Sequence, residues 1–152
     1  MRIPLTAATL LVAACLAGCD GGNGGSGDES RWAGPPEPAE DGSVSVEDFA
    51  AHQADVDEAW ERSSATAAAE FLRLDEQSSS RLMIDRTAPG EGGAPETVVV
   101  TLDGLFDDSV RAERWTLVFE PDGETYVLAS ALWAQRCQPG RGHQAFTAEA
   151  CF

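Results

Sequence analysis

The chain has 152 residues, of which 26 are acidic and 10 are basic, so its formal net charge at pH 7 is −16. This charge repels nucleic acid phosphates and anionic lipid headgroups, which excludes nucleic acid from the expected partners. The length is enough for one small hydrophobic core.

The first eighteen residues have the layout of an export signal. One basic residue, Arg2, precedes an apolar stretch over residues 3–16, and the small residues Ala17 and Gly18 follow it before Cys19. The stretch is interrupted by a proline and two threonines, and it is shorter than the roughly 20 apolar residues of a membrane-spanning helix. We therefore expect residues 1–18 to be removed as a signal peptide.

The sequence Leu16-Ala17-Gly18-Cys19 resembles the lipobox of bacterial lipoproteins. The resemblance implies that the chain is cut before Cys19 and that the thiol of Cys19 is diacylated, since two or more acyl chains give a stable anchor. The expected partner is then the lipid bilayer. The expected location is the cell envelope, outside the cytoplasmic membrane, with inner or outer membrane left open. The alternative is an ordinary signal that leaves Cys19 free.

A segment rich in glycine, proline and acidic residues follows, over residues 19–44. Trp32 is its only large apolar residue, so this composition predicts a disordered tether with an end-to-end distance of roughly 25 to 30 Å. Loss of Arg2 with the signal leaves 26 acidic residues against nine arginines, a formal charge of −17. We expect a single folded domain over residues 45–152.

The domain is predicted to begin with an amphipathic helix. Ser45 and Asp48 have the spacing of a capping box, and apolar residues then recur at intervals of three and four as far as Trp60. Serine and threonine residues at 63–66 interrupt the pattern before a second helical piece over residues 67–74. One bent helix and two short helices fit the sequence equally well.

From Arg81 onward the apolar period changes to two, which predicts strands. Residues 81–86 and 97–105 form two candidates, separated by a loop over residues 87–96. Residues 110–137 predict a long hairpin whose turn contains proline and Asp-Gly at 120–124. The inward side chains are expected to be Val98, Val100 and Leu102, then Trp115, Leu117 and Phe119, and on the last strand either Val127, Ala129, Ala131 and Trp133 or Tyr126, Leu128 and Leu132.

These elements predict an α+β fold in which the helix packs on an antiparallel meander of three or four strands. The order resembles that of cystatin-like and NTF2-like α+β rolls. Folds of this kind carry many activities, so the resemblance implies an architecture and no particular chemistry.

Two cysteines remain in the domain, because Cys15 leaves with the signal and Cys19 is lipidated. Cys137 and Cys151 predict one disulfide in an oxidising compartment, closing a loop of about 15 residues that contributes about 3 kcal/mol. A zinc site is the competing interpretation. Two cysteines with one nearby histidine are a poor ligand set for zinc, so we expect no metal.

The tail after Cys137 has the pattern C-x-P-G-R-G-H-x-x-F-x-x-x-x-C. It resembles the tails of small envelope proteins and lipoproteins of proteobacteria and, in outline, those of LppP/LprE-like lipoproteins of actinobacteria. The resemblance covers residues 108–151 and implies a strand that runs into a cysteine-closed loop. It implies a family and no activity.

Within this loop, residues 139–142 predict a turn whose two glycines take positive φ. Arg141 and His143 could then hold a carboxylate or a phosphate, with Trp133 and Phe146 flanking a sugar or a peptide. The alternative is that Arg141 pairs with nearby carboxylates and His143 bonds the backbone. The alternative is favoured, because a lone histidine in a closed loop is more often structural than functional.

No pattern of a known catalytic site is present. His52 and His143 are the two histidines, and the GxSxG, HExxH, CxxC, P-loop and EF-hand patterns are missing. We therefore expect a non-enzymatic binding module of the envelope, without a cofactor. Exposed apolar residues on the sheet would favour an envelope protein as partner. A cavity lined by Trp115, Phe119 or Trp133 would favour a small ligand or, less readily, an acid/base enzyme.

Overall fold

The computed structural model describes residues 31–87 and 93–152, so the predicted signal, Cys19 and part of the predicted tether and loop lie outside the described residues. Its elements in chain order are β1 (Ser43–Val44), α1 (Glu47–Asp55), the 3-10 helix η1 (Ala59–Arg62), α2 (Ser64–Phe71), β2 (Ser79–Arg86), β3 (Glu96–Leu105), β4 (Val110–Asp122) and β5 (Thr125–Cys137). Among the described residues, no helix combines the length and apolarity needed to cross a membrane.

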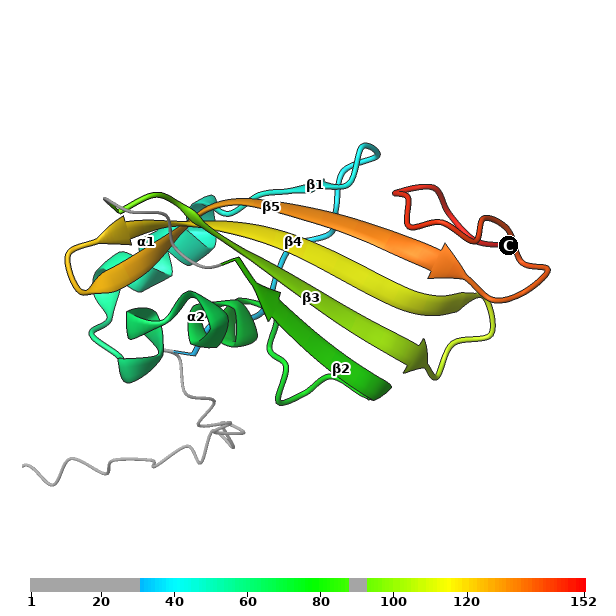
Figure 1. The fold of residues 1–152 in the computed structure, drawn as a ribbon, viewed down its shortest axis with the longest axis horizontal. Coiled ribbons are helices and arrows are strands. Elements are labelled where there is room, and N and C mark those ends of the chain that lie inside the picture. Colours follow the sequence, from blue (N-terminus) through cyan, green and yellow to red (C-terminus); the bar gives the residue numbers. More distant parts are fainter. Residues whose placement is uncertain (1–30, 88–92) are drawn as a thin grey trace, which may run out of the picture. The chain divides into compact units, whose positions relative to one another are not determined.

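The strands form one antiparallel sheet in the order β1-β5-β4-β3-β2, and the helices cover one face of it (Figure 1). The α+β class is confirmed. Strands β2 to β5 are the predicted meander of four strands, and the short strand β1 adds a fifth. The order of helices and strands supports the α+β class. The finer likeness to a cystatin-like or NTF2-like roll stays a prediction.

The core lies between the helices and the sheet. The predicted inward residues of β3 and β4 are all buried, as are Phe49 and Phe71 from the helices. Strand β5 follows neither predicted alternation. Neighbouring residues Val118 and Phe119 of β4 pair with Ser130 and Leu128, so one residue of β5 between them has no partner. The extra residue is a β-bulge, which turns Leu128 and then Ala131 toward the core.

The helical region is broken, as one of the two predictions allowed. The predicted capping box at Ser45 is wrong: α1 starts at Glu47 and its N-cap is Val46, which makes no capping hydrogen bond. A capping box does form one element later, where the side chains and backbones of Glu58 and Glu61 bond each other at the start of η1.

The predicted start of the domain at residue 45 is also wrong. The compact unit spans Arg31–Phe152. Trp32 packs edge-on against Phe49 with ring centroids 5.1 Å apart, and its indole N–H donates to the Phe71 carbonyl over 2.9 Å. Residues 31–44 therefore belong to the fold rather than to a tether, because one tryptophan in a polar segment completes the core.

Candidate functional site

The C-terminal loop is closed by a disulfide between Cys137 and Cys151, as predicted. Gly140 and Gly142 have φ of 83° and 134°, also as predicted. A Cβ at Gly142 would lie 2.8 Å from the Sγ of Cys137, so only glycine lets the turn approach the disulfide. The turn and the disulfide thus fix the shape of the loop together.

His143 holds the loop from the inside. Its Nδ1 lies 2.8 Å from the carbonyl oxygen of Ala145, and its Nε2 lies 2.8 Å from that of Glu149. A carbonyl oxygen only accepts, so both bonds form at once only when the ring is an imidazolium with two N–H groups. The bonds to Glu149 and Ala145 accordingly raise the pKa of His143. Both ring nitrogens are engaged with backbone, which supports the structural interpretation of this residue.

The other loop candidates point to different neighbours. Arg141 is half exposed, and its guanidinium lies 3.9 Å from the carboxylate of Asp108. Phe146 lies under two guanidinium groups, with Arg114 3.9 Å and Arg136 5.1 Å from the ring centroid. Phe146 is therefore occupied by cation–π contacts within the chain.

Trp133 lies on the opposite face of the sheet from Phe146. Trp133 pairs directly with Trp115, whose side chain is buried on the helix-covered face. Arg114 precedes Trp115 in the strand, so its side chain points to the other face, where Phe146 covers it. The prediction that Trp133 and Phe146 flank one ligand is wrong, because the loop folds over the face that Trp133 does not share.

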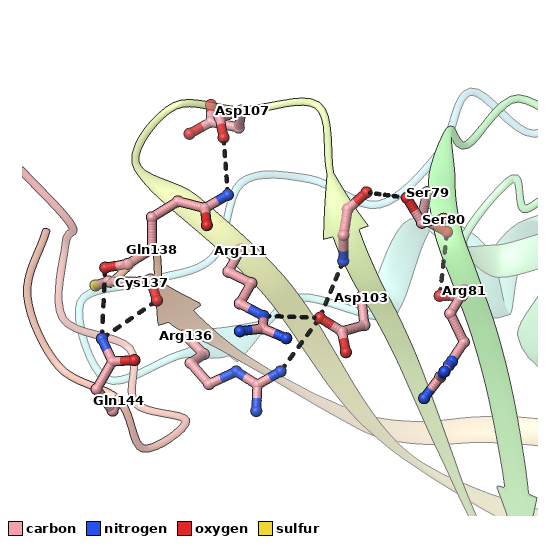
Figure 2. A network of polar contacts seen from close by, with 11 residues as sticks. Ser79, Ser80, Arg81, Asp103, Asp107, Arg111, Arg136, Cys137, Gln138 and Gln144 are labelled. Carbon is pink, nitrogen blue, oxygen red and sulfur yellow. Dashed lines mark hydrogen bonds and ion pairs between the residues drawn. The ribbon is translucent and has the colours of Figure 1, made fainter. Parts of the chain in front are cut away.

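A polar cluster that the sequence did not predict lies on this outer face. Asp103 accepts from Arg111 over 3.4 Å and from Arg136 over 3.2 Å, and Figure 2 shows both guanidinium groups turned toward it. Burial alone would raise the pKa of Asp103, but the bond from Arg111 and the charge of Arg136 outweigh it and hold the pKa low. A neighbouring hollow of about 260 Å³ is lined by Ser80, Arg81, Asp103, Gly104 and Arg111.

Glu96 is a carboxylate inside the core. It is 1% exposed and accepts from the Ser64 hydroxyl over 2.5 Å and from the Tyr126 hydroxyl over 2.7 Å, with Arg86 3.7 Å away. Burial would raise the pKa of Glu96, but these two bonds and the charge of Arg86 lower it on balance. The group ties α2, β3 and β5 together, and its burial keeps it from any substrate.

Glu113 is the other carboxylate with a notable environment. It pairs with Gln135 across β4 and β5, on the face of the sheet that carries Trp115 and Trp133. Burial raises the pKa of Glu113, and hydrogen bonds from the two tryptophan side chains offset the rise only in part. No histidine or second carboxylate forms a hydrogen bond with Glu113 within the described ranges.

The donor atoms of Cys137, His143 and Cys151 lie within 4.8 Å of one another. A metal would require both thiolates, and the disulfide consumes both. The two cysteines for which zinc was the competing interpretation therefore form the covalent closure of the loop instead.

The most exposed apolar segment of the sheet is β2. Leu82, Met83 and Ile84 are 45%, 41% and 41% exposed. By contrast, Trp115 and Phe119 are buried in the core, and neither they nor Trp133 line the two hollows found among the described residues. In this part of the chain, the exposed apolar residues are therefore the feature that favours a protein partner.

The two edges of the sheet differ in their backbone hydrogen bonding. Along β5, the Gln53 side chain bonds the backbone of Tyr126 and Leu128, and β1 pairs with residues 131 and 132. Farther along, the backbone N–H groups at 133, 135 and 137 donate to residues 42, 147 and 143 over 2.8, 2.8 and 3.1 Å. Strand β2 is the last in the order and has no partner on its outer side within the described residues. One edge is closed and the other is open.

The chain matches no family model, no curated protein and no solved structure. The candidate site therefore rests on the geometry of these residues. Its sequence signal was present: residues 82–84 are three successive apolar residues in a strand, whereas a strand with one solvated face alternates. Successive apolar residues place apolar side chains on both faces of a strand, which indicates that both faces are buried when a partner is bound.

Proposed function

We propose that this chain is a lipid-tethered module of the bacterial cell envelope that acts by binding protein along the edge of β2, without catalysis. The observation that carries the proposal is the open β2 edge with its three exposed apolar side chains. Isolated exposed apolar residues are ordinary on protein surfaces, but three in succession on a strand whose outer edge is unpaired are not.

An open edge offers two kinds of interaction at once. Its free backbone N–H and C=O groups can pair with an added strand, and the alternating side chains provide specificity. Arg81, Asp85 and Arg86 lie around the apolar residues of β2. Such charges discourage indiscriminate strand pairing, so the edge admits only a partner that satisfies them.

The lipid anchor is the second part of the proposal, and the lipobox ending at Cys19 supports it. The net charge of −16 would keep the protein surface away from anionic headgroups. Attachment would then depend on the acyl chains, while the domain stays free to meet proteins at the membrane surface.

One experiment on the exported full-length chain tests both parts. A photoreactive amino acid replacing Leu82 is expected to give a protein adduct in intact envelopes. The same amino acid replacing Glu124, in the exposed turn between β4 and β5, is expected to give none. Labelled palmitate is expected to enter the wild-type chain and not Cys19→Ala.

Each part can fail separately. Absence of adducts from position 82, or equal adducts from positions 82 and 124, would contradict binding along β2. Palmitate labelling that persists in Cys19→Ala would contradict the anchor.

A further inference from the structure

The outward-facing backbone groups of β2 can be assigned from one hydrogen bond. Just beyond the strand, the Thr87 N–H donates to the Thr97 carbonyl over 2.9 Å, so Thr87 and Thr97 are a hydrogen-bonded antiparallel pair. Such pairs recur at every second residue. The odd-numbered residues of β2 therefore bond β3, and the backbone groups of Ser80, Leu82, Ile84 and Arg86 point to the open edge.

We propose that the partner of this edge is a second copy of the same chain. The β2 strands of the two copies pair antiparallel about a two-fold axis at Met83, which joins the two five-stranded sheets into one. The inference rests on the proposed function, because it names the occupant of the edge through which the module is proposed to bind protein.

The register follows from the backbone and from the side chains independently. With Met83 opposite Met83, the outward-pointing pairs are Leu82 with Ile84 and Ser80 with Arg86, as an antiparallel ladder requires. In the same register, Arg81 of each copy faces Asp85 of the other. Two guanidinium–carboxylate pairs and two leucine–isoleucine pairs then form from the single sequence Arg-Leu-Met-Ile-Asp.

The neighbouring registers lack this complementarity. An axis at Leu82 would place Arg81 opposite Met83 and Asp85 opposite Ser79. An axis at Ile84 would place Asp85 opposite Met83. Both leave the two charges beside apolar or neutral residues, so the axis at Met83 is the one that the charges select.

Both charged residues are available for a partner. Neither Arg81 nor Asp85 forms an ion pair within the part of the chain that is described. Arg81 pairs in register with Asp103, but that carboxylate is already bonded by Arg111 and Arg136. Figure 2 draws no contact between the guanidinium of Arg81 and this cluster.

The net charge of −16 on each copy opposes association. At an ionic strength of about 0.15 M the screening length is about 8 Å, so charges spread over the two domains are largely screened. The oppositely charged groups of Arg81 and Asp85 would be in contact, so screening would weaken their attraction less. The association is therefore expected at physiological salt and is expected to weaken at low salt.

A charge-swap series tests the proposal. The full-length chain is examined by sedimentation equilibrium in density-matched detergent at about 0.15 M salt. The wild type is expected to be a dimer. Arg81→Asp and Asp85→Arg each place like charges opposite each other twice, and each is expected to raise the dissociation constant about tenfold or more. The double variant R81D/D85R restores opposite charges and is expected to restore the dimer.

Glu124→Arg is the matched control, because it changes the net charge as much as Asp85→Arg does but lies in the turn between β4 and β5. It is expected to leave the dimer intact, and circular dichroism checks that all variants fold. A monomeric wild type would overturn the inference. A double variant no better than the single ones would overturn it as well. If the wild type is a monomer while position 82 still forms adducts with another envelope protein, the inference fails and the proposed function stands.

Discussion

The imidazole of His143 lies between two backbone carbonyls, and this placement determines how the loop responds to pH. Both bonds require a protonated ring, and they raise the pKa of His143 in the folded chain. In the unfolded chain the pKa is close to its ordinary value of about 6.5. The stabilisation is therefore complete below about pH 6.5 and is lost as the pH rises through the higher folded pKa.

We predict that the loop over residues 138–151 is better protected below pH 6.5 than above the folded pKa. Amide hydrogen exchange, corrected for the intrinsic effect of pH, measures this protection, and NMR titration of the ring gives the folded pKa. His143→Gln should remove the pH dependence. Protection that is constant over this range, or that increases with pH, would contradict the double hydrogen bond.

At the scale of the elements, the sequence allowed prediction where local patterns determine structure. The hairpin of β4 and β5 followed from its period of two and its Pro-Asp-Gly turn, and the inward faces of β3 and β4 followed from alternation. The bulge opposite Val118 and Phe119 has no local signal. The core position of Trp32 also depends on contacts with distant helices, so composition alone suggested a tether.

The same distinction holds for the candidate site. The disulfide and the structural interpretation of His143 could be predicted, because two cysteines lie close together in the chain and the histidine lies in the loop between them. The separation of Trp133 and Phe146 onto two faces could not, since it depends on the path of the loop over β5. The Asp103 cluster likewise depends on the sheet, which brings Arg136 from β5 close to a carboxylate on β3.

The contribution of residues 31–44 to the core can be tested at Trp32. Trp32→Ala removes an indole that is 9% exposed, and it is expected to cost about 3 to 5 kcal/mol of unfolding free energy. Leu132→Ala is the control, because Leu132 is 53% exposed and its loss should change stability by no more than about 0.5 kcal/mol. Urea denaturation measures both. A Trp32→Ala variant as stable as the control would show that residues 31–44 do not contribute to the core.

For the whole molecule, the fold protects one edge of its sheet and leaves the other available. Side chains, a short strand and the C-terminal loop close β5, whereas β2 presents apolar residues between opposite charges. In the proposed dimer these residues cover each other. With the anchor proposed at Cys19, each dimer would carry two lipid anchors, which would hold it on the membrane more firmly than one.

The most direct test of the β2 pairing is a cysteine at the proposed axis, in the exported full-length chain under mild oxidation. Met83 would face its own counterpart in a pair without backbone hydrogen bonds, where Cα atoms lie about 4.5 Å apart, so Met83→Cys is predicted to form an intermolecular disulfide. Ser80→Cys is the control, since its two copies would be about 20 Å apart along the strands and Ser80 forms neither of the proposed ion pairs. A covalent dimer from Met83→Cys and none from Ser80→Cys is the predicted result. No cross-link at position 83, or equal cross-linking at both positions, would contradict pairing along β2.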